Sequence, residues 1–367
     1  MNIFILAGEP SGDEYGAKLM KNISAQQENI NFIGIGGSLM EKQGLQSIVP
    51  LNKMSVMGFF EVIKTLPFFI KLEKNILKLI DEKKPEKIIL IDYPGLNLRL
   101  ASKIKLLINT KIFYYISPQI WAWKEKRIET IKKYIDKMIV IFEFEKKWYQ
   151  KRSVDVEYVG HPFLDIWEKG KTSAMIKKYN IDINKPILTL FPGSRNQELK
   201  KHLKLFIDVA LKIKLTIPNL QILLGLHPDI KLQQKINKDI IVINNEPLKA
   251  LEIANVAIVA SGTATLQAAI MNTPAIVVYK MNLISWYLTQ KMVKVNYASM
   301  ANIIAEEEIF PEYLQSKANI KNLCNATYKI LKDNNYRQAL NQKIKLINQK
   351  IGSIGASKRA AEYIVNN

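Results

Sequence analysis

The feature that most constrains this chain is the alternation of short apolar, β-branched runs with longer segments of helical pattern. The runs form two series: 2–7, 31–36, 86–92, 111–116, 137–142 and 156–159, then 186–191, 220–226, 239–244, 256–260 and 275–279. Strands that alternate with helices form βαβ units, and these build a parallel sheet with helices on both faces. The two series therefore predict an α/β protein with two doubly wound, Rossmann-like parallel-sheet domains.

The strand rhythm stops over 161–186, a segment with proline near each end. Because domain boundaries fall in such breaks, we place an N-terminal domain at 1–170 and a C-terminal domain at 171–317. The remaining segment, 318–367, is rich in Lys, Gln and Asn. We expect it to be helical and to pack back on one domain or the other.

The 367-residue chain has 53 basic and 33 acidic residues, a formal net charge of +20. That charge suits nucleic acid or an anionic membrane surface, but the lysines are spread along the chain and no nucleic-acid-binding module accompanies them.

Cys324 is the single cysteine, which excludes an intrachain disulfide and a cysteine-rich metal site. The three histidines are far apart in the sequence, which favours packing or turn roles over metal ligation. Turn residues interrupt the uncharged segment 253–279, so no transmembrane helix is expected.

Ligands of open parallel sheets bind at the carboxyl ends of strands, and Asp92 stands at such an end. The residues before it are apolar, and Pro94 and Gly95 then break the strand. A carboxylate at this exit is partly desolvated, which raises its pKa and suits a general base. The alternative is that Asp92 caps the helix that begins near Leu96.

A second polar stretch, AGEPSGD, follows the first predicted strand and contains Glu9, Ser11 and Asp13. Its two glycines allow a tight turn and the close approach of a ligand. Ser11 or Asp13 can equally cap the following helix. A binding loop and a structural turn both stay open here.

In the second domain, the stretch FPGSRNQEL places Ser194 and Arg195 between a strand and a helix. Arginine offers bidentate hydrogen bonds to phosphate oxygens, and a helix N-terminus adds free N–H groups. Diphosphate binding is therefore favoured over plain capping. The stretch ASGTATLQAAI places Ser261, Gly262 and Thr263 at another helix start.

Gln267 follows one turn after Thr263, where a Glu or Gln side chain can hold the ribose hydroxyls. The two stretches together predict a nucleotide diphosphate site in the second domain. In the first domain, Trp121 and Trp123 lie beside a basic run. They can line a sugar or acyl site, but packing is the favoured interpretation.

The segment 52–84 is apolar and basic together, with one helical stripe and more aromatic residues than the stripe needs. Surplus aromatics beside lysines suit a helix that dips into an anionic leaflet, and a wholly buried helix is the competing interpretation. The candidates for membrane or acyl contact are Met57, Phe59, Phe60, Phe68 and Phe69.

Taken in order, nine stretches resemble the lipid-A-disaccharide synthase family, which has the two-domain GT-B architecture of glycosyltransferases. They are AGEPSGD, SVMGFFEVI, IDYPGLN, YYISPQIWAWKEKR, VGHPF, FPGSRNQE, ASGTATLQAA, VVYKMN and ANIIAEEEIFPEYLQ. The resemblance implies transfer of 2,3-diacylglucosamine from its UDP form to the 6-hydroxyl of 2,3-diacylglucosamine 1-phosphate. The product is the β-1,6 disaccharide 1-phosphate, UDP is released, and the anomeric centre is inverted. Another GT-B UDP-sugar transferase or a UDP-sugar epimerase is the alternative.

The same resemblance implies roles for individual residues. Asp92 would be the base, and Glu9, Ser11 and Asp13 would line the sugar and acceptor pocket of a cleft between the domains. The donor site would comprise Ser194, Arg195, Ser261, Gly262, Thr263, Gln267 and Asn302. No metal or cofactor is expected, nor a nucleic-acid partner, and homo-oligomerisation stays open. The expected place of action is the cytoplasmic leaflet of the inner membrane, with the protein attached peripherally.

The chain departs from the family pattern at three places. The family usually has Glu where this chain has Gln267, Pro where it has Ala301, and a Gly near Glu306. Gln267 keeps an acceptor oxygen but lacks the charge, so we expect weaker ribose binding with activity retained.

Overall fold

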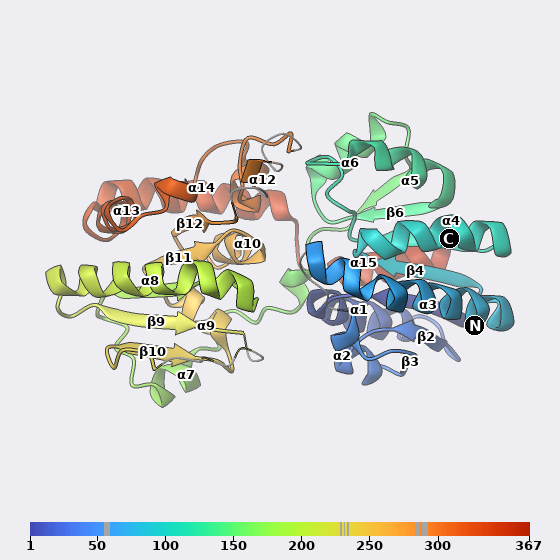
Figure 1. Ribbon diagram of the computed structural model, residues 1–367, viewed down its shortest axis with the longest axis horizontal. Helices are drawn as coiled ribbons and strands as arrows, with labels where there is room; N and C mark the ends of the chain where they lie inside the picture. Colours follow the sequence, from blue (N-terminus) through green and yellow to red (C-terminus); the bar gives the residue numbers. More distant parts are fainter. Residues whose placement is uncertain (55–58, 228–229, 231, 233–234, 283–285, 288–292) are drawn as a thin grey trace. The chain divides into compact units, whose positions relative to one another are not determined.

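The computed structural model describes residues 1–54, 59–227, 230, 232, 235–282, 286–287 and 293–367. The chain divides into two units, Met1–Trp167 with Ile351–Asn367, and Glu168–Lys350. Each unit contains one parallel sheet with helices on both of its faces (Figure 1). The prediction of two Rossmann-like α/β domains is confirmed.

The first unit has a seven-stranded sheet in the order β3-β2-β1-β4-β5-β6-β7. The three-residue edge strand β3 is absent from the predicted runs. The strands are β1 (Asn2–Ala7), β2 (Asn31–Ile35), β3 (Leu45–Ser47), β4 (Lys87–Ile91), β5 (Lys111–Tyr115), β6 (Lys137–Val140) and β7 (Val156–Tyr158).

In the described part of this unit, seven α-helices pack around the sheet: α1 (Pro10–Ser24), α2 (Ser38–Glu41), α3 (Phe59–Lys83), α4 (Pro94–Leu107), α5 (Ile128–Tyr134), α6 (Glu143–Gln150) and α15 (Ala356–Asn366). Three short 3-10 helices complete the described part of the unit, at Leu51–Lys53, Glu125–Arg127 and Pro162–Asp165. The last helix, α15, therefore belongs to the first unit although it ends the chain.

Alternate strand residues point to opposite faces of the sheet, and both faces are apolar. On one face, the core of Leu6, Leu90 and Tyr114 packs with helices α3 and α4. Leu72, Ile76 and Ile80 of α3 are at most 2% exposed, which confirms that this stripe belongs to the core. Burying each such side chain contributes about 1.5–3 kcal/mol to folding.

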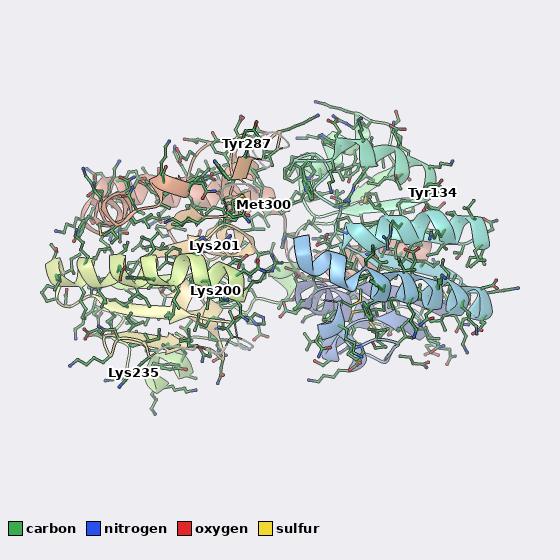
Figure 2. The ribbon with its side chains drawn as sticks, in the orientation of Figure 1. Tyr134, Lys200, Lys201, Lys235, Tyr287 and Met300 are labelled. Atoms are coloured by element: carbon green, nitrogen blue, oxygen red, sulfur yellow. The ribbon has the colours of Figure 1, made fainter. Side chains whose placement is uncertain are left out.

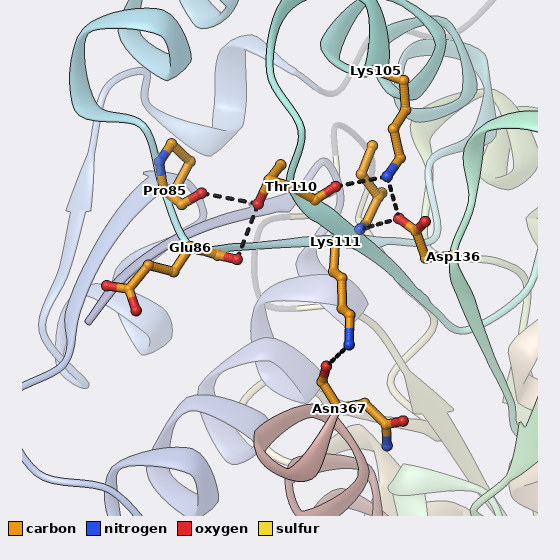
Figure 3. A network of polar contacts seen from close by, with 8 residues as sticks. Pro85, Glu86, Lys105, Thr110, Lys111, Asp136 and Asn367 are labelled. Atoms are coloured by element: carbon orange, nitrogen blue, oxygen red, sulfur yellow. Dashed lines mark hydrogen bonds and ion pairs between the residues drawn. The ribbon is translucent and has the colours of Figure 1, made fainter.

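A polar network ties together the amino ends of the central strands of the first unit (Figure 3). The hydroxyl of Thr110 donates to the carbonyl oxygen of Pro85 at 2.9 Å and to that of Glu86 at 3.0 Å. Lys105 pairs with Asp136 at 2.6 Å, and Asp136 accepts the backbone N–H of Ile112 at 2.7 Å. The network connects the starts of β4 and β5 with the segment before β6.

The second unit has a six-stranded sheet in the order β10-β9-β8-β11-β12-β13. Its strands are β8 (Ile187–Phe191), β9 (Gln221–Gly225), β10 (Ile240–Ile243), β11 (Val256–Ala260), β12 (Ala275–Tyr279) and β13 (Glu312–Leu314). Its helices are α7 (Ser173–Lys178), α8 (Asn196–Thr216), α9 (Pro247–Glu252), α10 (Thr263–Ile270), α12 (Met300–Ala305), α13 (Ile320–Lys332) and α14 (Asn334–Ile351), with a 3-10 turn at Gln315–Lys317. The segment 318–367 is thus shared, because α13 and nearly all of α14 stay with the second unit.

Both sheets reverse their strand order at one place. In the first sheet β1 lies beside β4, with Ala7 opposite Ile91, and in the second β8 lies beside β11, with Phe191 opposite Val259. Crevices at such switch points are where doubly wound sheets bind ligands. The loops that leave these four strands are therefore the candidate positions for a ligand.

Candidate functional site

The loop after β4 holds Asp92 in a strained turn. Asp92 and Tyr93 both have left-handed backbones, with φ of 44° and 50°. Such conformations cost on the order of 1–3 kcal/mol per residue and persist where surrounding contacts hold them. The Asp92 N–H donates to the Tyr115 carbonyl at 3.0 Å, and its own carbonyl accepts from Asn97 Nδ2 at 2.7 Å. The Tyr93 hydroxyl donates to the Met54 carbonyl at 2.9 Å.

At this switch point the loop after β1 packs closely against the loop after β4. A Cβ on Gly8 would lie 2.4 Å from the Tyr93 ring, so only glycine fits there. Glu9, the residue before α1, is half-buried, and its charge acts on Asp92. Burial raises the pKa of Asp92 to about 7, the charge of Glu9 raises it too, and a hydrogen bond from the Tyr93 backbone opposes them. The predicted carboxylates, Glu9 and Asp92, are therefore neighbours.

Asp13 has a structural role that its sequence motif does not reveal. Its side chain is 5% exposed and accepts the backbone N–H groups of Gly37, Leu39 and Met40 at 2.8, 3.1 and 3.0 Å. Both carboxylate oxygens hold the start of α2, so Asp13 positions this loop and does not present a free carboxylate. Ser11 is half-buried in the first turn of α1.

The loop after β5 is anchored by Glu145, a residue that the sequence analysis did not select. Glu145 is 1% exposed and accepts hydrogen bonds from the Ser117 hydroxyl at 2.7 Å and the Trp121 indole N–H at 3.1 Å. Burial raises its pKa to about 7, against the opposing effect of these hydrogen bonds. Its only sequence signal is a position in the first turn of α6, where a carboxylate can accept from the preceding backbone N–H of Phe142.

The loop after β8 carries Ser194 and Arg195 to the start of α8, and both are exposed. Glu198 shapes this loop, because it accepts the Ser194 N–H at 2.9 Å and lies 3.8 Å from Arg195 Nη1. A Cβ on Gly193, at φ 123°, would lie 2.4 Å from Glu198. The first turn of α8 also directs backbone N–H groups at this loop. Arg195 and a helix N-terminus are thus brought together as predicted.

His202, one turn further along α8, fastens the same loop to the end of β12. Its Nδ1 lies 3.0 Å from the Pro192 carbonyl oxygen, and its Nε2 accepts the backbone N–H of Lys280 at 3.1 Å. Burial lowers its pKa, so the ring stays neutral. This agrees with the packing role favoured for the histidines.

The loop after β11 places Gly262 and Thr263 in exposed positions at the start of α10. A Cβ on Gly262 would meet nothing within 4 Å, so the backbone there is open. Ser261 is half-buried, and its hydroxyl donates to the Ala298 carbonyl at 2.8 Å. Gln267 is half-buried, and its side chain forms no hydrogen bond with any other described residue.

Asn302 lies behind this loop and has no exposed surface. Its amide donates to the Phe310 carbonyl at 2.7 Å and to Glu312 at 2.8 Å, and it accepts the N–H groups of Ile309 and Phe310 at 3.0 and 2.8 Å. These contacts use the whole amide. Glu312 also accepts the N–H of Ala298 at 2.7 Å, which connects Asn302 to the partner of Ser261. Asn302 therefore orders the loop that supports the site and does not offer its side chain to a ligand.

The candidate membrane contacts divide into three groups. Met57 lies outside the described residues, and Phe59 and Phe60 fall within the bounds of α3 but their side chains are not described. Phe68 and Phe69 are half-buried against the core, with their rings 5.3 Å apart. Among the described side chains of this helix, the exposed large apolar residues are Leu66 and Ile70, at 45% and 48%.

Comparison with known proteins extends over the whole chain. The family model described as Lipid-A-disaccharide synthetase matches residues 3–365. The lipid-A-disaccharide synthase of Coxiella burnetii (strain CbuK_Q154) is 32% identical over 369 residues, covering 100% of this chain and 98% of that protein. Lipid-A-disaccharide synthase 1 of Legionella pneumophila (strain Paris) is 36% identical over 86% of this chain and 84% of its own length.

Two solved structures with the same fold contain UDP-GlcNAc. The UDP-GlcNAc 2-epimerase of Neisseria meningitidis bound to UDP-GlcNAc has a TM-score of 0.67 at 12% identity, with 100% of both chains covered. The UDP-GlcNAc 2-epimerase of Methanocaldococcus jannaschii, in complex with UDP-GlcNAc and UDP, has a TM-score of 0.66 at 16% identity, again with both chains fully covered. At these identities the likeness establishes the two-domain fold alone.

Proposed function

The chain belongs to the lipid-A-disaccharide synthetase family, and from this membership we propose the reaction that it catalyses. The enzyme is a disaccharide-forming glycosyltransferase. We propose that its donor is UDP-2,3-diacylglucosamine and its acceptor 2,3-diacylglucosamine 1-phosphate. The products are then the β-1,6 disaccharide 1-phosphate and UDP, with inversion at the anomeric carbon.

The observation that carries the proposal is the Asp92 turn. Inversion is a single displacement: the acceptor oxygen forms a bond to the anomeric carbon as the bond to the UDP oxygen breaks, and the hydroxyl proton passes to a base. Asp92 is a half-buried carboxyl with a pKa of about 7 at a switch point of the first sheet. A base with a pKa near the working pH is the most effective one. Asp92 is therefore assigned as the base, and Glu9 and Ser11 as residues of the same pocket.

The donor side of the proposal rests on the two loops of the second unit. The leaving UDP gains negative charge as its bond to the sugar breaks, and Arg195 with the first turns of α8 and α10 provides positive charge and N–H donors at one switch point. Ser194, Ser261, Gly262 and Thr263 form the walls of this site, with Asn302 behind them. Gln267 is assigned to the ribose hydroxyls.

A direct assay tests the reaction. Purified full-length protein is incubated in detergent with the two acylated glucosamine substrates, and the disaccharide 1-phosphate and UDP are measured by mass spectrometry. Both products should form in equal amounts. Folded protein that forms neither product contradicts the proposal, and conversion of the donor alone to a second UDP-sugar points to epimerase activity instead.

The role of Gln267 has its own test. Gln267→Glu should tighten UDP binding by about 3- to 10-fold in titration calorimetry, because a charged acceptor forms stronger hydrogen bonds with the ribose hydroxyls. Gln267→Ala is the matched control and should weaken binding. A weaker affinity in the Glu variant would remove the ribose role from this position.

The substrates carry acyl chains, and we propose that α3 attaches the protein peripherally to the cytoplasmic leaflet of the inner membrane. Among the described residues, no helix is both long and apolar enough to cross a bilayer. Leu66 and Ile70 are exposed one turn apart, and the exposed Lys71 and Lys74 are close to them on the helix. Apolar side chains beside lysines suit insertion at an anionic lipid surface.

Liposome sedimentation tests this attachment. The wild-type protein should bind vesicles that contain anionic lipid, and binding should fall as salt rises, since the Debye length shortens from about 10 Å at 0.1 M to about 3 Å at 1 M. The double variant Leu66→Ser, Ile70→Ser should bind several-fold less. Leu215→Ser, which changes an 85% exposed leucine of the second unit, is the control. Equal binding of the double variant and the wild type would exclude this face of α3.

A further inference from the structure

The loop after β5 contains two tryptophans with opposite surroundings. Trp121 is 8% exposed, and its indole N–H donates to the buried Glu145. Trp123, two residues later, is 39% exposed. The Lys124 ammonium lies 4.4 Å from the centre of its ring, and the Arg127 guanidinium carbon lies 6.0 Å away. An exposed ring with two cations beside it differs from ordinary packing.

The charges of Lys124 and Arg127 are not neutralised by the described residues around them. In the part of the chain that the structure describes, neither Lys124 nor Arg127 forms an ion pair with a carboxylate. Glu125, which lies between them, pairs with Arg152 at 2.6 Å. Burial and the nearby charge of Arg127 both lower the pKa of Lys124. A bound anion would relieve this repulsion between like charges.

The cluster and Asp92 belong to the same unit and follow two neighbouring strands of its sheet, β5 and β4. The strand β5 pairs with β4, and the Tyr114 hydroxyl of β5 donates to the Asp92 carbonyl oxygen. Burial raises the pKa of Tyr114 and the charge of Asp92 raises it further, whereas the charge of Arg127 lowers it. The charges of Asp92 and Arg127 thus act in opposite directions on the pKa of one buried hydroxyl.

The loop is also held in a defined shape. Ile116 and Lys124 have left-handed backbones, with φ of 66° and 56°, and Ile116 is a β-branched residue for which this conformation is unfavourable. The hydrogen bonds of Ser117 and Trp121 to Glu145 secure the segment between them. Strain that surrounding contacts maintain gathers at ligand sites.

We propose that Trp123, Lys124 and Arg127 bind the sugar phosphate of the acceptor. The Trp123 ring packs against the sugar, Arg127 offers a planar pair of donors to the phosphate oxygens, and Lys124 adds a second charge. The reacting 6-hydroxyl is attached to C5 through C6 and the 1-phosphate is attached to C1, and these two carbons flank the ring oxygen. The base and the phosphate-binding cations must therefore lie close to each other, which the loops after the neighbouring strands β4 and β5 allow. This assignment rests on the proposed function and selects the acceptor as the substrate bound here.

The kinetic test compares the acceptor with its analogue that lacks the 1-phosphate. Arg127→Ala and Lys124→Ala should each raise the KM for the phosphorylated acceptor by about 10- to 100-fold, and leave the KM for the UDP donor unchanged. With the unphosphorylated analogue, each variant and the wild type should have the same KM. An equal rise in KM for both acceptors would show that these residues have a structural role, and it would overturn the proposal.

Two further variants make the assignment specific. Lys126→Ala removes an exposed lysine of the same turn that does not contact the Trp123 ring, and its KM for the acceptor should match that of the wild type. Trp123→Leu should raise the KM for both acceptors alike, because both contain the sugar. If Lys126→Ala has the same effect as Arg127→Ala, the interaction is only a general attraction to positive charge and the subsite is excluded.

A binding measurement separates this proposal from the proposed function. Glucosamine 1-phosphate should quench the fluorescence of Trp123 in a saturable way, and glucosamine should do so far more weakly. The quench should disappear in Trp123→Leu and Arg127→Ala. If the wild-type protein forms no disaccharide, the proposed function is wrong. The fluorescence measurement does not require turnover, so it still shows whether this cluster binds a sugar phosphate. A quench that is absent in the wild type, or unchanged in Arg127→Ala, overturns it.

Discussion

Asp92→Asn should lower kcat by roughly 100-fold or more, the usual contribution of a general base, with little change in either KM. The amide has the size of the carboxyl group but cannot accept the proton of the acceptor hydroxyl. The backbone contacts that hold the turn, from Tyr115, Asn97 and Tyr114, involve main-chain atoms of residue 92 and survive the substitution. The measurement is steady-state turnover of both substrates.

The pH profile gives this prediction a second measurement. Since burial raises the pKa of Asp92 to about 7, the carboxylate form appears as the pH rises through 7. The kcat/KM of the wild-type enzyme should therefore rise about tenfold per pH unit below 7 and level off above it. The Asn variant should lose this inflection. Glu9→Gln removes a negative charge that raises this pKa, so the inflection should move to lower pH.

Protein stability supplies the control. A carboxyl group whose pKa is higher in the folded than in the unfolded state binds its proton more tightly when folded. Its ionisation therefore weakens the fold as the pH rises from the unfolded value towards about 7. At pH 8, Asp92→Asn should unfold at a temperature equal to or above that of the wild type. Near-normal turnover in this folded variant would reject Asp92 as the base.

Arg195→Ala should lower kcat/KM by roughly 100-fold, the loss typical for removing one donor that stabilises developing charge. Most of the loss should appear in kcat, because the charge on UDP grows as its bond to the sugar breaks. Arg195→Lys should recover part of the rate, since it keeps the charge but not the planar pair of donors.

Arg195 directly precedes helix α8, and its matched control is Lys200→Ala, near the start of that helix (Figure 2). Lys200 is also exposed and cationic, and its loss should change kcat/KM by less than about 3-fold. Arg195 lies 3.8 Å from Glu198, and exposed pairs of this kind contribute little to stability. The wild-type protein, Arg195→Ala and Lys200→Ala should therefore have the same unfolding temperature. Equal losses in Arg195→Ala and Lys200→Ala would indicate only long-range attraction of the anionic donor.

The sequence predicted most of the framework because buried parallel strands are visible as continuous apolar runs. The strands β3 and β13 were missed, although the equally short edge strand β7 was predicted. The strand β7 lies within an apolar run at 156–159, whereas β3 and β13 have no such run around them. The stripe of α3 was visible because Leu72, Ile76 and Ile80 recur at helical spacing on a buried face.

The site could be predicted only in part. Motifs after strands selected Asp92 and Arg195 as candidates, because strand ends and helix starts can be located from patterns. The same patterns do not predict whether a polar side chain is available to a ligand. Asp13 and Asn302 are polar residues of the same motifs, yet both satisfy backbone groups. Glu145 has no motif of its own, and its buried contacts come from a loop 24 to 28 residues away.

By itself, the sequence determined the class of fold, the family and the loops that carry polar residues, because these depend on local periodicity and on ordered motifs. Tertiary structure alone decided which of those polar side chains form hydrogen bonds within the fold and which remain available to a ligand. It also set the raised pKa of Asp92, through burial and the charge of Glu9. Hydrogen-bond partners, desolvation and neighbouring charges come from residues distant in the sequence, and no local pattern encodes them.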